Sequence, residues 1–279
     1  MSKYINPYTD FGFKKLFGEE ANKDLLIDFL NELLPSNHHI FDLHFRNSET
    51  PPELQSERKA IFDIHCESKT GERFIVEMQK AKINRAANRF FKDRSLFYAS
   101  IPIREQAKQG KWDFKLPPIY MIAILDFDYD EAEEKRKFIR SVYLKDQDGD
   151  IFYEKLHFKF LQMRLFNKTV LELETHFDKW MYFLKNLENI EEIPAILQEP
   201  IFEKAFEIAK VSNMTPEQFE QYQESLLTYI EVKEVVKTAE LDGEKKGKKE
   251  VARELKKLGI DKEIIIKSSG LSSFEIDEL

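Results

Sequence analysis

The order of the predicted secondary-structure elements places this chain in the α/β (α+β) class. Apolar residues recur at helical spacing over residues 10–34 and 82–109, and segments that alternate like strands lie between and after them. The continuous apolar run "IYMIAIL" is typical of a central strand buried on both faces. Residues after about position 170 return to helical spacing, so neither a helical bundle nor an all-β sandwich fits the pattern.

The first helical segment has clear start and stop signals. Asp10 is a natural N-cap, Gly18 divides the segment into two helices, and Pro35 ends it. The residues that follow predict a first strand in "HIFDLHFRN", a loop in "PPELQSE", and then two strands at 58–67 and 72–80.

The second half of the chain contains further strands and then helices. "KFIRSVYLKD" and "LHFKFLQMRLF" alternate as strands, and "TPEQ" opens a long helix with a capping box and a proline at its first position. The block "DGEKKGKKE" predicts a linker or a frayed helix. We therefore expect a core at residues 1–170, a helical extension at 171–240, and a charged linker with a short helical tail at 241–279.

Composition limits the class of protein. The chain has 279 residues, of which 42% are hydrophobic and 24 are phenylalanine, enough for a substantial core. One cysteine, Cys66, excludes an internal disulfide framework and suits a reducing compartment. The N-terminus has no apolar signal-peptide region, and no apolar run is long enough to span a bilayer. We therefore expect a cytoplasmic protein with no membrane association.

The net charge of −8 disfavours nucleic acid as a partner, but the charge is unevenly distributed. Residues 80–115 hold ten basic and three acidic residues. This local surplus of positive charge can attract phosphate, because the local field dominates at close range.

The stretch "AIFDIHCESKTGERFIVEMQK", residues 60–80, predicts a hairpin with acids at matched positions. "KTG" indicates a three-residue loop with Gly71 in the left-handed conformation, so that the numbers of opposed residues sum to 140. Asp63 then lies opposite Glu77, and strand alternation puts both acids and Gln79 on one face. Like charges with Cβ atoms about 4.5–5.5 Å apart are destabilising unless something lies between them.

A divalent cation between the two acids would remove this repulsion. Carboxylate oxygens at such a separation suit Mg²⁺ or Mn²⁺, with water in the remaining positions. Two alternatives stay open at this point: a solvated sheet face with scattered acids, or a strand pairing that is slipped by one residue.

These residues also resemble a known family. Asp63, followed after thirteen residues by Glu77-Met78-Gln79 on the next strand, is similar to the motif of the PD-(D/E)XK nuclease superfamily. The opening "YTDFGFKKLFG", and "EMQ" followed by "NRFFKDRSLFYAS", resemble its transposase and recombination-promoting nuclease branch. The resemblance covers about residues 5–130 well and the helical second half more loosely. It implies a restriction-endonuclease-like mixed sheet flanked by helices, and metal-dependent hydrolysis of DNA phosphodiester bonds.

The resemblance implies a role for each matching residue. Asp63, Glu77 and the Met78 carbonyl would bind Mg²⁺ or Mn²⁺, and Asp10 would join them unless it only caps its helix. Gln79 would complete the catalytic set of Asp63, Glu77 and Gln79 by orienting water or phosphate. It stands where the superfamily usually has lysine, and the first acid is not preceded by the usual proline.

The long predicted helix carries candidate DNA contacts. Arg94 and Tyr98 lie one turn apart on one face and would approach the site. Four basic residues share another face, which is either a ridge of phosphate contacts or solvated surface. These candidates are Lys82, Arg85, Arg89 and Lys92.

Together these features predict a metal-dependent DNA endonuclease of a mobile-element or recombination type. The alternative is a catalytically inactive DNA-binding or protein-interaction module on the same fold, which the uncharged Gln79 and the net acidity favour. The helical C-terminal region is expected to allow a homodimer.

Overall fold

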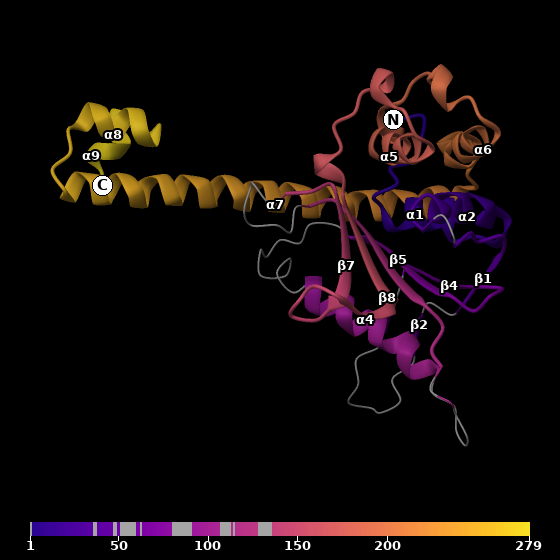
Figure 1. Ribbon diagram of the computed structural model, residues 1–279. Coiled ribbons are helices and arrows are strands. Elements are labelled where there is room, and N and C mark those ends of the chain that lie inside the picture. Colours follow the sequence, from indigo (N-terminus) through magenta and orange to yellow (C-terminus); the bar gives the residue numbers. More distant parts are fainter. Residues whose placement is uncertain are drawn as a thin grey trace. The chain divides into compact units, whose positions relative to one another are not determined.

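The computed structural model divides into two compact units (Figure 1). Among the described residues, those up to Tyr229 form the first unit, and Ile230–Leu279 form the second. The described residues are 2–35, 38–46, 49–50, 60–61, 63–79, 91–106, 113, 115–127 and 136–279.

A mixed six-stranded sheet forms the centre of the first unit. Its strands are β1 (Leu43–Phe45), β4 (Ile64–Ser68), β5 (Arg73–Gln79), β6 (Ile119–Leu125), β7 (Ile139–Lys145) and β8 (Ile151–Gln162). They lie in the order β1-β4-β5-β6-β8-β7, with β5, β6 and β8 parallel and the other pairs antiparallel. The whole of β6 is buried, as the apolar run predicts. A separate antiparallel pair consists of β2 (Glu49–Thr50) and β3 (Ala60–Ile61).

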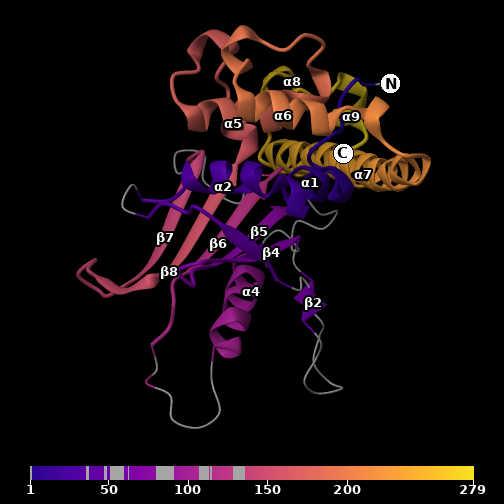
Figure 2. The same cartoon turned by 90° about the vertical axis from the view of Figure 1, so that its right-hand side faces the viewer.

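Helices flank the sheet, which confirms the predicted α/β class. The α-helices are α1 (Asp10–Phe17), α2 (Lys23–Asn31), α4 (Phe91–Glu105), α5 (His176–Asn186), α6 (Pro200–Ala209), α7 (Pro216–Lys257), α8 (Lys262–Ser269) and α9 (Ser273–Asp277). Short 3-10 helices are η1 (Glu20–Asn22), η3 (Met163–Leu165), η4 (Val170–Glu172), η5 (Leu187–Asn189), η6 (Ala195–Leu197) and η7 (Val211–Asn213). Helices α1 and α2 cover one face of the sheet and α4 covers the other (Figure 2).

One apolar core fills the space between the sheet and the helices of the α1 side. Phe74 and Val76 of β5 are fully buried in it together with Phe17 of α1. Trp180 of α5 packs against Phe17 with ring centroids 5.6 Å apart, and Phe202 of α6 packs against Trp180 at 4.8 Å. The helices that follow residue 170 therefore share the core of the sheet rather than forming a core of their own.

The cap of α1 differs from the prediction. Thr9, not Asp10, is the N-cap, and its Oγ1 accepts a hydrogen bond from the Gly12 N–H at 2.9 Å. In the same turn, residue 12 lies very close to the backbone of Asn6. A Cβ at position 12 would lie 2.2 Å from the Asn6 carbonyl oxygen, so only glycine fits there. Asp10 is consequently the first helical residue, and the cap does not occupy its carboxylate.

The linker interpretation of the charged block at 242–250 is wrong, because these residues are helical and lie inside α7. The predicted capping box is present: the Gln218 N–H donates to Thr215 Oγ1, and the Thr215 N–H donates to Gln218 Oε1, both at 3.2 Å. One ion pair between successive turns, Lys248–Glu244 at 2.7 Å, lies within the charged block and adds to the stability of the helix.

The second unit has a small apolar core of its own, formed by Ala252, Ile265, Leu271 and Ile276. No helix within the described parts of the chain is both long and apolar enough to cross a membrane. Of the long helix predicted at 82–109, the described part is α4, and residues 80–90 and 107–112 lie outside the described residues.

A charged hydrogen-bond cluster ties α2 to α5 at the edge of the core. Asp28 Oδ1 lies 2.6 Å from His176 Nε2 and also accepts a hydrogen bond from Trp180 Nε1 at 2.6 Å. Glu199 lies 3.5 Å from His176 Nδ1. The hydrogen bond with Asp28 raises the pKa of His176, although burial acts in the opposite direction.

This cluster predicts a pH-dependent stability. A raised folded-state pKa means that the contribution of His176 is complete below the unfolded pKa of about 6.5 and is lost as pH rises through the folded value. We expect His176→Gln to remove about 1 kcal/mol of unfolding free energy at pH 6 and progressively less as the pH rises through the folded-state pKa. Urea titrations across this range measure the difference, and a constant difference would contradict it. His39→Gln, at an exposed position, is the control.

Candidate active site

The β4–β5 hairpin has the predicted register. Ile64 pairs with Val76 and Cys66 pairs with Phe74, so the numbers of paired residues sum to 140. Gly71 closes the loop with a φ of 93°, and its N–H donates to the Ser68 carbonyl at 3.1 Å. A left-handed residue at this point of a three-residue loop sets the register of both strands. The slipped-register alternative is therefore wrong.

Asp63 and Glu77 meet where the hairpin ends. The Asp63 N–H donates to Glu77 Oε1 at 3.1 Å, and the Met78 N–H donates to Asp63 Oδ2 at 2.7 Å. Each acid thus accepts a backbone hydrogen bond from the opposite strand. These bonds hold two carboxylates close together in spite of their like charge.

The face that carries the acids is covered by α4 and is not a solvated surface. Glu77 is 2% exposed, and its neighbours on that face, His65 and Ile75, are buried as well. Burial and, after it, the negative charge of Asp63 raise the pKa of Glu77 well above its usual value. A buried acid beside a second acid is typical of functional sites, because it costs stability unless something compensates for the charge.

Gln79 and two residues of α4 complete the surroundings of the acids. Gln79 Nε2 donates to Glu77 Oε2 at 2.5 Å, and Arg94 Nη2 donates to Gln79 Oε1. Tyr98 lies one turn further along α4. Burial raises its pKa, and the charges of Glu77 and Asp63 contribute to the increase. The structure therefore brings Arg94 and Tyr98 to the acids, as the sequence predicts.

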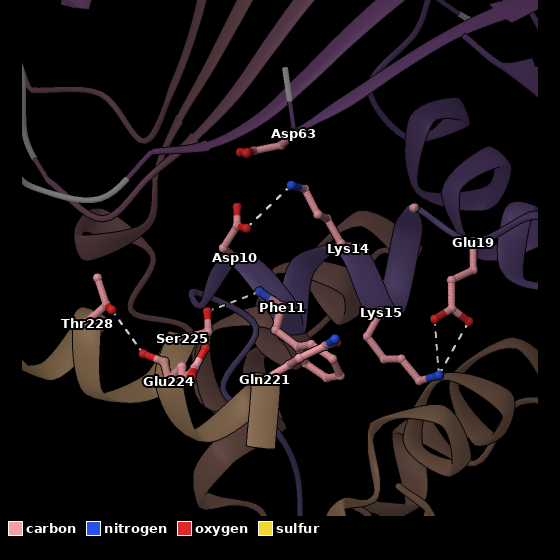
Figure 3. Close-up of a pocket in the computed structure, with 11 residues that line it drawn as sticks. Asp10, Phe11, Lys14, Lys15, Glu19, Asp63, Gln221, Glu224, Ser225 and Thr228 are labelled. Carbon is pink, nitrogen blue, oxygen red and sulfur yellow. Dashed lines mark hydrogen bonds and ion pairs between the residues drawn. The ribbon is translucent and has the colours of Figure 1, made fainter. Parts of the chain in front are cut away.

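A pocket of about 770 Å³ opens beside Asp63 (Figure 3). Asp10 and Lys14 of α1 line it and form an ion pair at 3.4 Å, with more than half of the Asp10 side chain exposed. Helix α7 supplies the opposite wall through Ser225 and Thr228. Asp10 and Asp63 therefore face the same pocket, whereas Glu77 and Gln79 lie behind Asp63 under α4.

The donor atoms at the hairpin end suit a hard divalent cation. The N–H of Met78 faces β4, and the carbonyl of the next residue, Gln79, faces β6 and accepts from the Asp126 N–H at 3.0 Å. Because N–H and C=O of one strand residue point to the same side, the Met78 carbonyl also points to the β4 side of β5. Two carboxylates and a carbonyl give three hard oxygen donors. Within the described residues, no group of three or more His, Cys, Asp and Glu side chains could hold a metal ion, so Asp10 does not form such a cluster with the two acids.

The predicted DNA-contact residues are only partly described. Lys92 lies in the first turn of α4, is exposed, and lines a second pocket of about 410 Å³ with Arg140 of β7. The other three residues of the predicted basic face, Lys82, Arg85 and Arg89, lie outside the described residues.

Sequence reasoning did not identify the contribution of α7 to the site. Asp126, directly after β6, accepts a hydrogen bond from the Tyr229 hydroxyl at 3.0 Å, and Ser225 Oγ accepts from the Phe11 N–H at 3.1 Å. These contacts join residues that are 103 and 214 positions apart in the chain. The helical spacing of α7 predicts a buried stripe but gives no information about which element it packs against.

Comparison with known families agrees with this geometry. The family described as PD-(D/E)XK nuclease family transposase matches residues 7–239. The chain therefore belongs to this family of nuclease-like transposases. The match extends through α5, α6 and half of α7, so the helices that share the core belong to the family fold as well. No curated protein and no solved structure matches the chain.

The buried acid predicts a second pH effect on stability. The pKa of Glu77 is raised in the folded state, so its contribution is complete below the unfolded value of about 4.5 and is lost as pH rises through the folded value. In EDTA, the melting temperature of the wild type should fall as the pH rises above the unfolded value of about 4.5. Glu77→Gln should flatten this fall and melt higher at neutral pH.

Thermal melting over this pH range measures the effect. The control is Glu72→Gln in the same hairpin, because hydrogen bonds to Ser68 and Thr70 lower the pKa of Glu72 despite its partial burial. A fall in melting temperature that is equally steep in the wild type and Glu77→Gln would show that Glu77 is not its source.

Proposed function

We propose that this chain is a metal-dependent endonuclease that hydrolyses phosphodiester bonds of DNA in a mobile-element or recombination process. The observation that carries the proposal is the pairing of Asp63 with the buried Glu77 at the hairpin end, beside an open pocket. Membership of a PD-(D/E)XK nuclease family supports the same activity.

Asp63, Glu77 and the Met78 carbonyl are the proposed ligands of Mg²⁺ or Mn²⁺, and Asp10 is a further candidate from across the pocket. When bound, the ion lowers the pKa of a water molecule and offsets charge that develops on the phosphate. Gln79 holds an amide donor toward Glu77 and is proposed to orient water or phosphate there.

DNA is proposed to approach the site over α4 and the segment that precedes it. Lys82, Arg85, Arg89 and Lys92 are the proposed phosphate contacts, and the basic surplus at 80–115 would attract the DNA backbone. Of the two acids, Asp63 is the one that lines the open pocket.

A non-catalytic module on the same fold is the second candidate function. The uncharged amide at Gln79 favours it, as does the lack of a three-acid cluster within the described part of the chain. The two functions differ in one assay, since only the endonuclease converts supercoiled plasmid to nicked or linear DNA when Mg²⁺ or Mn²⁺ is added. A homodimer through the helical C-terminal region also stays a prediction, for which sedimentation velocity is the test.

Loss of either acid should abolish cutting. Asp63→Ala and Glu77→Ala are expected to reduce plasmid nicking in Mg²⁺ by at least about 10³-fold, because each removes a proposed metal ligand. The folded structure should persist, since removing one of two crowded acids relieves repulsion. Plasmid nicking and circular dichroism measure the two effects.

The matched control for these variants is Asp148→Ala, in the exposed turn between β7 and β8. It should nick plasmid at the wild-type rate. Nicking by purified Asp63→Ala and Glu77→Ala at that same rate would show that the proposed site is wrong.

The basic face makes a prediction about salt dependence. If Arg85 and Arg89 contact phosphates, changing both to alanine should make the slope of log affinity against log salt shallower by about 1.8 on duplex DNA. Fluorescence anisotropy in Ca²⁺, which blocks cutting in many Mg²⁺-dependent nucleases, measures affinity across a salt series. Lys137→Ala with Lys145→Ala, at two exposed positions beside or within β7, is the control. An unchanged slope in the Arg85 and Arg89 variant would mean that this face is only solvated surface.

A further inference from the structure

The guanidinium group of Arg94 lies next to the side chains of the candidate site. Arg94 is half-buried on the face of α4 that covers β5 and β6, and its Nη2 donates to Gln79 Oε1. An arginine side chain can only donate hydrogen bonds, so the oxygen of the Gln79 amide must be the atom that faces Arg94. The nitrogen then faces Glu77 Oε2, at 2.5 Å, where a carboxylate can only accept.

Both ends of the Gln79 amide are therefore fixed by their partners. An isolated glutamine amide has two orientations of nearly equal energy, because rotation by 180° exchanges two groups of similar size. In this site the reversed orientation would place a carbonyl oxygen against a carboxylate and an amide N–H₂ against a guanidinium. Arg94 thus selects the orientation in which Gln79 offers donors toward the acids.

The charge of Arg94 acts on the same group of side chains. Arg94 Nη2 donates to the Gln79 amide, and the same amide donates to Glu77, so one side chain separates the guanidinium from the buried carboxylate. Arg94 therefore lies close enough to stabilise an ionised carboxylate in a buried position.

We propose that Arg94 is a positioning residue of the site, which holds the Gln79 amide with its N–H groups toward Glu77 and supplies the positive charge that Gln79 lacks. The proposal rests on the endonuclease function proposed above. In this arrangement the chain Arg94–Gln79–Glu77 takes the place of a single cationic side chain at position 79. Arg94 does not need to touch the substrate, because it acts through the amide.

The test uses three variants of the full-length chain. Arg94→Gln removes the charge, Arg94→Lys retains a charge and a donor, and Arg94→Gln with Gln79→Lys moves the charge to position 79. Arg94→Gln should lower kcat for plasmid nicking in Mg²⁺ about 10- to 100-fold, with KM for DNA changed less than about 3-fold. Arg94→Lys should retain more activity than Arg94→Gln, and the double variant should recover at least about 10-fold over Arg94→Gln.

The control is Arg253→Gln, which removes the same charge from an exposed position of α7, outside the basic stretch at 80–115. It should leave kcat and KM unchanged. Arg94→Gln at the wild-type kcat would overturn the proposal. So would a loss of activity that neither Arg94→Lys nor the Gln79→Lys double variant recovers.

A second readout does not depend on activity. In EDTA, Arg94→Gln should lower the melting temperature when residue 77 is glutamate, and should change it much less in the Glu77→Gln background. An equal decrease in both backgrounds would mean that Arg94 only packs against the sheet, and the proposal would fail. If the wild type cuts no DNA with any divalent metal, the proposed function fails, and this melting cycle still decides whether Arg94 is linked to Glu77.

Discussion

The candidate site depends on a three-residue turn. Gly71 adopts a φ of 93°, which fixes how β4 and β5 pair, and the pairing puts Asp63 beside Glu77. A one-residue change in this turn would move every side chain of one strand to the other face. Asp63 would then point into the apolar core and Ile64 would face Glu77. The turn at Gly71, at the other end of the hairpin, therefore determines which side chains of β4 and β5 come together in the site.

Much of this arrangement could be predicted from the sequence because it is local. The hairpin, its loop and the two faces of β4 and β5 follow from alternation and from one glycine, and the buried β6 follows from seven consecutive apolar residues. The resemblance to the family motif then indicated that the two acids are candidate metal ligands. The role of each site residue still stands as a prediction, because register and burial do not measure metal binding or catalysis.

Other features could not be predicted, because they depend on contacts between distant parts of the chain. A solvated face and a covered face have the same alternation, so only the position of α4 shows that Glu77 is buried. Thr9 and Asp10 are both good N-cap residues, and the choice between them depends on how closely Gly12 approaches the Asn6 backbone. The charged block at 242–250 has two glycines and no large apolar residue, yet it is helical and contains an ion pair between successive turns.

The bonds between the start of the chain and α7 bear on where the protein can be shortened. The Asn6 N–H donates to the Tyr222 hydroxyl at 2.9 Å, and the Phe11 N–H donates to Ser225 Oγ. The Tyr229 hydroxyl donates a hydrogen bond to Asp126, the residue that follows β6. All three partners on α7 belong to the first unit, and the tyrosine rings are buried in its core. A fragment that ends before residue 216 would retain both acids and lose the α7 wall of the pocket beside Asp63, whereas one that ends after Tyr229 would retain the whole first unit. The C-terminal limit of the first unit thus lies within α7, far in the sequence from Asp63 and Glu77.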